Sequence, residues 1–211
     1  MKKVNGKQKG SNFERTIAKK ISLFLTDNQR DDTIWRSISS GAFATNRKKK
    51  GLKSENQTGD LTSISEESKL FFDVFSIECK SYKKIDLYHL IDNTSNLEKW
   101  YKKLYEDTIE NDPKKSPLLI FKQDFKPVMC VCNTFILDYF MYNFVQKDHP
   151  DNCMTNFSEK HSLSATFNIP HNIQNSHVTH VEIFQLDDLL DIPLKQFKQS
   201  LIQIKKDYEI K

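Results

Sequence analysis

Hydrophobic residues recur with helical spacing in three stretches of the chain. Residues 11–25, 85–107 and 194–204 each place them on one stripe, which predicts amphipathic helices that pack by one face. Residues 93–96 are a candidate break that would divide the second of these helices in two. Ser11 and Glu14 fit a capping box, in which the serine caps the helix and the glutamate reaches back, so we expect the first helix to begin at Ser11. The stripe of that helix consists of Phe13, Ile17, Ile21 and Phe24.

Other apolar runs are rich in Phe, Val and Ile, which favours strands. The most prominent one, residues 70–80, reads LFFDVFSIECK and is expected to be a strand throughout. Residues 61–64 form a shorter β-like run, and residues 66–69 are expected to join the two strands as a hairpin. Further short strands are expected at residues 33–37, 118–121, 128–132 and 181–184, the last of them at a sheet edge.

Two segments are harder to assign from their pattern. Residues 135–145 are almost all apolar, and Asn133 and Thr134 in front of them favour a helix, because such residues cap helix N-termini. Residues 149–177 are polar and weakly patterned, and we interpret them as an insertion. Together, the helices and strands predict an α/β fold with a mixed central β-sheet flanked by helices.

Length and composition bound the organisation of the chain. Its 211 residues, 37% hydrophobic and 28% charged, suffice for one domain with a substantial core. We expect a basic flexible tail at residues 1–10, a core at residues 11–145, and a C-terminal extension at residues 146–211 that packs on this core.

Charge and cysteine content narrow the possible partners. A net charge of +4 permits binding to nucleic acid without establishing it. No apolar run reaches the about 20 residues of a membrane-spanning helix, so we expect no membrane partner. The four cysteines form no C-x-x-C pair, which indicates reduced thiols; we expect a cytoplasmic location in a bacterial or phage-infected cell.

Candidate chemistry gathers around the end of the run at residues 70–80. Glu78 and Lys80 are two positions apart, so a strand would place them on one face, with Cys79 on the other. Asp60 opens the preceding strand and brings a second carboxylate to the same region. Carboxylates bind Mg²⁺, and a lysine can stabilise developing charge beside it. The alternative is an exposed Glu–Lys pair without function, worth under about 1 kcal/mol.

These residues, taken with others along the chain, resemble the PD-(D/E)xK nuclease superfamily. The resemblance covers roughly residues 9–82 and is closest to the archaeal-type Holliday junction resolvases and related phage endonucleases. Two features depart from that pattern: Gly59 replaces the usual proline, and the loop at residues 41–60 is longer. The matching residues are Gly10, Ser11, Glu14, Arg15, Arg36, Ser39, Ser40, Gly41, Asp60, Glu78, Cys79 and Lys80.

The resemblance implies a restriction-endonuclease-like core and a magnesium-dependent cleavage of DNA. Glu14, Asp60 and Glu78 would hold Mg²⁺, for which Mn²⁺ is expected to substitute, and the Cys79 carbonyl would add a ligand. Lys80 would assist the attacking water, so the expected catalytic residues are Glu14, Asp60, Glu78 and Lys80.

Binding of DNA is expected to involve basic and hydroxyl side chains. Arg15 and Arg36 would hold phosphates, since guanidinium groups bind phosphate oxygens in pairs. The run from Arg47 to Lys50 is either a solvated loop or a contact to the DNA backbone. The expected DNA-binding residues are Arg15, Arg36, Ser39, Ser40, Arg47, Lys48, Lys49 and Lys50.

Several functions remain open on the sequence alone. The first is a structure-selective endonuclease like the Holliday junction resolvases, acting as a homodimer because a four-way junction needs two symmetric cuts. The second is a sequence-specific nuclease or one linked to replication or recombination. The third is a catalytically silent DNA-binding module, and the fourth is a structural protein in which the motifs are coincidental. Trp100 and Tyr101 are expected in the core, although an exposed aromatic residue there could stack on bases.

Overall fold

The computed structural model describes residues 6–37, 59–85, 87–90, 95–140, 162–172 and 175–209. Six of the expected DNA-binding residues lie outside this part of the chain: Ser39, Ser40, Arg47, Lys48, Lys49 and Lys50.

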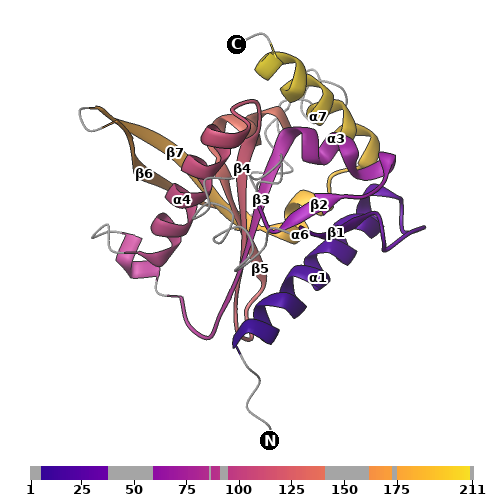
Figure 1. Cartoon of the computed structure of the whole chain (residues 1–211), viewed down its shortest axis with the longest axis horizontal. Coiled ribbons are helices and arrows are strands. Elements are labelled where there is room, and N and C mark those ends of the chain that lie inside the picture. Colours follow the sequence, from indigo (N-terminus) through magenta and orange to yellow (C-terminus); the bar gives the residue numbers. More distant parts are fainter. Residues whose placement is uncertain are drawn as a thin grey trace, which may run out of the picture.

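A five-stranded sheet with the order β3-β4-β5-β7-β6 forms the centre of the molecule (Figure 1). β3 runs parallel to β4, and the other neighbouring strands are antiparallel, so the sheet is mixed as predicted. A separate two-stranded sheet pairs β1 (Ile34–Arg36) with β2 (Leu61–Ser63). The strands of the large sheet are β3 (Phe75–Tyr82), β4 (Ser116–Gln123), β5 (Val128–Asn133), β6 (Leu163–Asn172) and β7 (Asn175–Gln185).

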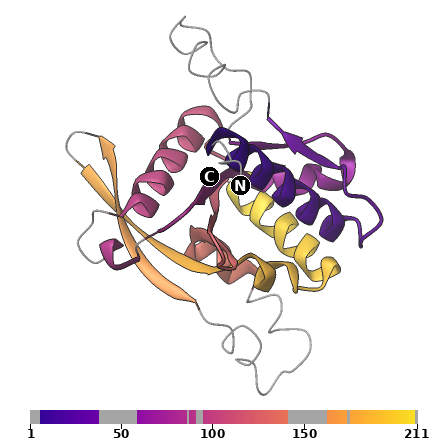
Figure 2. The same ribbon diagram turned by 90° about the horizontal axis from the view of Figure 1, so that it is seen from below.

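Helices cover both faces of this sheet and bury a separate hydrophobic cluster on each. Figure 2 shows α4 on one side, and α1 with α7 on the other. The α1 side buries Ile17, Ile77 and Phe197 together, whereas the α4 side buries Tyr101 against Leu119. The labelled helices are α1 (Gly6–Leu25), α3 (Glu66–Val74), α4 (Asn96–Asn111), α6 (Leu186–Leu190) and α7 (Leu194–Glu209), with a 3₁₀ turn, η1, at Leu87–Leu90. Residues 134–140 are helical as well.

The strand expected at residues 70–80 is wrong in its first half. Residues Glu66–Val74 form α3, and β3 begins only at Phe75. The expected hairpin at residues 66–69 is therefore wrong as well, and β2 pairs with β1 instead of β3. A short apolar run does not distinguish helix from strand, but acids at Glu66 and Glu67 in the first turn favour the helix through its dipole.

The first helix begins earlier than expected. α1 starts at Gly6, so Ser11 lies within the helix and the predicted capping box is wrong. Residues 6–10 of the predicted tail are helical, and the Lys9 ammonium pairs with the Asp124 carboxylate in the turn between β4 and β5. This contact comes from a distant part of the chain, which a local pattern cannot reveal.

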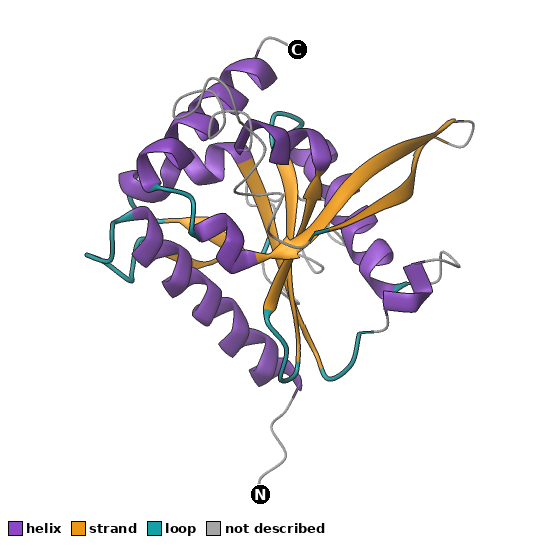
Figure 3. Ribbon diagram, turned by 180° about the vertical axis from the view of Figure 1, so that it is seen from behind, coloured by secondary structure: helices purple, strands orange, loops and turns teal. Residues whose placement is uncertain are grey.

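The C-terminal part of the chain completes the sheet. The segment interpreted as an insertion contains β6 and the start of β7, which are long antiparallel strands that project from the body (Figure 3). The edge position expected for residues 181–184 is wrong, because β7 lies between β5 and β6. Phe184 and Phe197 share one hydrophobic cluster with Phe13, so residues beyond 145 contribute to the same core as α1.

Other predictions are confirmed. β4 and β5 form the expected antiparallel hairpin, and α7 contains the expected closing helix. Residues 134–140 are helical, and the Asn133 side chain accepts a hydrogen bond from the Phe135 amide at 2.8 Å, as a cap should. The residues beyond 140 in that expected helix lie outside the described part of the chain.

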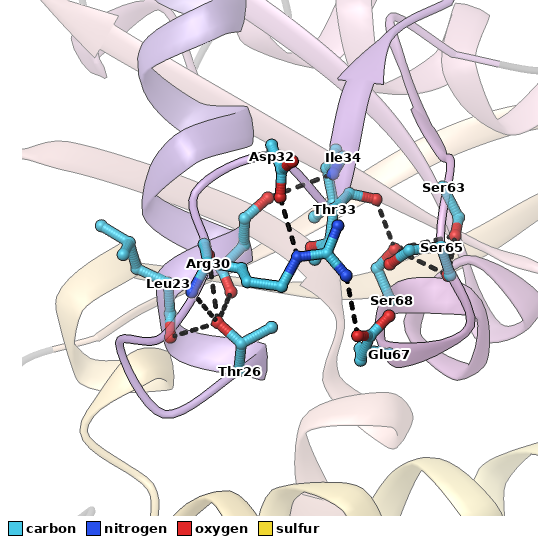
Figure 4. A network of polar contacts seen from close by, with 11 residues as sticks. Leu23, Thr26, Arg30, Asp32, Thr33, Ile34, Ser63, Ser65, Glu67 and Ser68 are labelled. Atoms are coloured by element: carbon cyan, nitrogen blue, oxygen red, sulfur yellow. Dashed lines mark hydrogen bonds and ion pairs between the residues drawn. The ribbon is translucent and has the colours of Figure 1, made fainter.

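A polar network anchors the small sheet to α1 and α3 (Figure 4). The Arg30 guanidinium bridges Asp32 at 3.0 Å and Glu67 at 2.9 Å. The buried Ser68 hydroxyl donates to the Thr33 carbonyl at 2.7 Å. The Ile34 amide in turn donates to the Ser22 hydroxyl of α1 at 3.1 Å. These contacts fix the position of β1, and with it that of Arg36.

Candidate active site

Asp60 lies where the large and the small sheet meet. Its amide donates to the Ile77 carbonyl of β3 at 2.7 Å, while its own carbonyl accepts from the Ser37 amide beside β1 at 2.8 Å. The next β3 donor, the Cys79 amide, therefore bonds the Asp60 carboxylate at 2.9 Å. The carboxylate takes the place that a backbone carbonyl would take in a parallel ladder. Asp60 is thus held against the free edge of β3.

Gly59 permits this close approach. Its φ is +92°, a conformation that side chains with a Cβ rarely adopt. A Cβ at this position would lie 2.3 Å from the Ile77 carbonyl oxygen. Proline, with φ near −65°, could not adopt this conformation either. The glycine that departs from the usual motif is therefore required by the backbone of this chain.

Glu78 and Lys80 lie on the face of β3 that points toward α4. They form an ion pair, and their side chains are 26% and 27% exposed. The alternate residues Phe75, Ile77 and Cys79 are buried on the opposite face. The predicted alternation at the end of this strand is confirmed, and it places a carboxylate and an ammonium group at the rim of an apolar core.

Burial shapes the electrostatics of this group. It raises the pKa of the Asp60 carboxyl, which the Cys79 amide and the charge of Lys80 only partly offset. Burial and the neighbouring Asp60 charge likewise raise the pKa of Glu78. Burial opposes the charge on Lys80, but the charge and hydrogen bond of Glu78 together with the charge of Asp60 outweigh it, so the pKa of the Lys80 ammonium is raised. Asp60, Glu78 and Lys80 therefore act on one another within a single site.

Glu14 approaches this group from α1. Its carboxylate forms an ion pair with the Arg36 guanidinium of β1, and only 12% of the Glu14 side chain is exposed. The charge of Glu14 contributes to raising the pKa of both Asp60 and Cys79, so Glu14 lies near these two residues. Arg15 is exposed on α1, where its guanidinium contacts the Asn12 side chain at 3.5 Å.

The carboxylate oxygens of the site suit a hard cation, although two of the carboxylates form ion pairs with basic side chains in this structure. Within the described residues, no group of three His, Cys, Asp or Glu side chains is arranged to hold a metal ion. Glu14 and Glu78 are instead directed at Arg36 and Lys80. The carboxylates supply the oxygen ligands that Mg²⁺ prefers. Their sharing of one ion stays a prediction.

Two features near the site were not anticipated from the sequence. Lys103 of α4 is close enough to Glu78 for its positive charge to offset part of the rise in the pKa of that carboxyl. Ser37 holds the Asp60 segment through its amide and through its hydroxyl, which donates to the Gly59 carbonyl at 2.6 Å. Lys103 follows Trp100 by one helical turn, so the spacing alone could have predicted that the two side chains share one face of the helix.

A mixed sheet with an acid at its edge and an E-x-K sequence on its edge strand is what the resemblance to PD-(D/E)xK nucleases implies. A family model described as "Phage putative PDDEXK endonuclease" matches residues 5–199. The chain belongs to this family and is thus a nuclease of the PD-(D/E)xK superfamily. No curated protein matches the chain. None of the helices in the described part of the chain combines the length and apolar character needed to cross a bilayer.

Proposed function

We propose that this nuclease is a divalent-metal-dependent DNA endonuclease whose active site lies at the free edge of β3. The observation that carries the proposal is the position of Asp60, whose carboxylate is bound to the Cys79 amide between Glu78 and Lys80 in sequence. This bond holds one acid next to the E-x-K segment, as family membership leads one to expect.

The proposed ligands are the carboxylates of Glu14, Asp60 and Glu78 together with the Cys79 carbonyl. Burial disfavours the charged forms of Asp60 and Glu78, so a cation would compensate an unfavourable pair of charges. Mg²⁺, or Mn²⁺ in its place, would lower the pKa of a bound water and neutralise charge on the phosphate.

Lys80 would position the attacking water or stabilise the developing charge. Its raised pKa keeps the ammonium protonated at neutral pH, so it acts as a donor and a positive charge, not as a base. Arg36 holds the Glu14 carboxylate in place and, with the exposed Arg15, would contact phosphates.

The DNA backbone would also be held by residues beyond the described part of the chain. We assign this role to Arg47, Lys48, Lys49 and Lys50, and a contact to the scissile strand to Ser39 and Ser40. Neutralising the four basic residues should weaken DNA binding for all sequences and lower the salt slope by about 0.9 per lost phosphate contact. An unchanged salt slope would show that these four residues form a solvated loop without contact to the DNA backbone.

We further propose that cleavage is structure-selective, as in the Holliday junction resolvases, and that the protein acts as a homodimer. A four-way junction needs two symmetric cuts, which a two-fold dimer supplies. Recognition of a defined sequence, or a role linked to replication or recombination, is the alternative that a substrate panel would reveal. The cytoplasm, where DNA of a bacterium or an infecting phage is accessible, is the proposed location.

The test is a cleavage assay on duplex, flap, single-stranded and four-way DNA, each with Mg²⁺, with Mn²⁺ and with EDTA. Cleavage that requires the metal and is lost in Asp60→Asn supports the proposal. Glu66→Gln on α3 is the matched control, because Glu66 is 86% exposed and forms a surface ion pair with the nearby Lys69. Tight DNA binding without cleavage of any substrate would favour the silent binding module.

A further inference from the structure

An aromatic pair continues the charged face of β3 beyond Lys80. Tyr82 shares this face with Glu78 and Lys80, because side chains two positions apart on a strand point the same way. The rings of Tyr82 and Trp100 lie 4.5 Å apart between centroids, with an interplanar angle of 34°. Tyr82 is 43% exposed, so the pair presents aromatic surface to solvent.

The hydrophobic core does not account for this exposure. On the α4 side the core is built by Leu97, Tyr101 and Leu104, all of which are buried. Trp100 lies at the rim of that cluster and is only partly buried. Tyr101, its neighbour in sequence, is fully buried, so the two adjacent aromatic residues have different surroundings.

The aromatic pair is continuous with the proposed active site. α4 packs against β3 and β4, and Lys103 lies one helical turn from Trp100 while its charge reaches Glu78. Trp100 therefore lies beside Tyr82, and Lys103 lies toward Glu78. At a strand rise of about 3.3 Å per residue, the backbone at Tyr82 is about 7 Å from that at Lys80.

Exposed basic residues lie next to the aromatic pair along the chain. Lys83 and Lys84 follow Tyr82 directly, and Lys99 and Lys103 flank Trp100 on exposed positions of α4. The nearest acid on that helix turn, Glu98, is buried and paired with Lys102 at 2.9 Å. A partner with a negative backbone and flat aromatic groups fits this surface, which is the chemistry of an unpaired nucleic acid strand.

We propose that the Tyr82–Trp100 pair stacks on an unpaired base of the DNA strand whose phosphate lies at Glu78 and Lys80. This inference rests on the proposed endonuclease function and adds a substrate class to it: DNA with a single-stranded stretch or a displaced nucleotide at the cut. A base within a duplex is stacked between its neighbours and cannot offer its face to the protein.

Intrinsic fluorescence tests the contact directly. The chain has two tryptophans, so Trp35→Phe leaves Trp100 as the only one. In EDTA, which prevents metal-dependent cleavage, a single-stranded oligonucleotide should quench Trp100, and a duplex of the same sequence should quench it much less. The reciprocal variant, Trp100→Phe, reports on Trp35, which lies on β1 and should respond weakly to both.

Substitution tests the contribution to binding and cleavage. Trp100→Leu and, separately, Tyr82→Leu should weaken binding of single-stranded or flap DNA about tenfold or more while duplex binding changes little. Trp100→Phe should retain most of the affinity, because it keeps an aromatic face. Phe135→Leu is the matched control: Phe135 is 48% exposed and forms a ring pair with Tyr139 at 5.2 Å, on the opposite face of the sheet.

The outcomes separate this inference from the proposed function. Normal metal-dependent cleavage with no quenching of Trp100, or an equal loss of single-strand and duplex binding in Trp100→Leu, overturns the base contact and leaves the endonuclease intact. A protein that neither binds nor cuts any DNA overturns both. Quenching specific to single strands, together with a selective loss in both leucine variants, supports the base contact.

Discussion

The two faces of β3 have different roles: one is apolar and packs in the core, and the other carries charged side chains. Phe75, Ile77 and Cys79 point toward α1 and are at most 6% exposed, where they join the larger hydrophobic cluster. Glu78 and Lys80 point toward α4 and form a half-buried ion pair. Alternation with a period of two residues makes both faces available within eight residues. The apolar face holds the strand rigidly, and the charged face uses this rigidity to position reactive groups.

The comparison also shows a cost of the charged face. Burial raises the pKa of Glu78 on this face and of Asp60 beside the strand, which means that their charged forms are less stable in the folded protein than in water. The apolar face has no such penalty. Substitutions on the charged face should therefore reduce cleavage more than stability, and substitutions on the apolar face should reduce stability more than cleavage.

The largest effect is expected for Lys80→Ala on the charged face. Turnover should fall by about two to four orders of magnitude, the scale of a lost electrostatic or acid–base group. Unfolding free energy should change by under about 1 kcal/mol, since the pair is partly solvated. Single-turnover cleavage and urea denaturation measure the two effects. Lys69→Ala, on the exposed Glu66–Lys69 pair, is the control and should change neither.

Ile77→Ala tests the apolar face. Ile77 is 0% exposed, so its truncation should lower the free energy of unfolding by about 2–5 kcal/mol through lost burial and a cavity. Molecules that remain folded should still cut DNA, because no reacting group is removed. Urea denaturation compared with Ile64→Ala, at a position 58% exposed, gives the measurement. A stability loss as small as that of the control would contradict the assignment of Ile77 to the core.

Gly59→Ala tests the link between the faces. The new Cβ would meet the Ile77 carbonyl oxygen at 2.3 Å, so the segment must move away from β3 and carry Asp60 with it. We expect a stability loss of about 1–3 kcal/mol from the strained backbone, together with impaired cleavage. Gly6→Ala is the control, since a Cβ there meets nothing within 4 Å. Equal stability and activity of the two variants would show that the close approach is dispensable.

The smallest effect is a pH dependence of stability, measured without divalent metal. Burial raises the pKa of Asp60 in the folded state, so the folded protein binds more protons than the unfolded one once the pH exceeds the unfolded value of about 3.9. Stability contributed by this group should therefore fall as pH rises through the window between the two pKa values. Asp60→Asn should remove this contribution to the fall, because the amide does not ionise, while its side-chain oxygen can still accept from the Cys79 amide.

The same variant tests metal binding without a cleavage assay. Mg²⁺ or Mn²⁺ should raise the melting temperature of the native protein, since a ligand that binds only the folded state stabilises it. In Asp60→Asn this rise should be much smaller. A metal-induced rise of equal size in both proteins would place the ion elsewhere.

Local periodicity was enough to predict the stripe of α1, the β4–β5 hairpin and the alternation of Glu78 with Cys79. In each case the pattern of a few consecutive residues determines which side chains share a face. The same kind of reasoning failed at residues 66–74, because an apolar run of that length satisfies a helix and a strand equally well. It also missed β6, whose polar residues become a strand through pairing with β7.

The identity of the candidate residues could be read from the chain, whereas their arrangement depends on contacts between distant segments. Asp60 meets Cys79 because its backbone carbonyl is engaged by Ser37, the residue that follows β1 of the small sheet. Trp100 and Tyr101 look alike in sequence, and only the packing of α4 decides that Tyr101 is buried while Trp100 lies against the Tyr82 ring. Residue types and their local period are properties of the chain itself. Which groups become neighbours follows from the long-range pairing and packing that exclude water from the core.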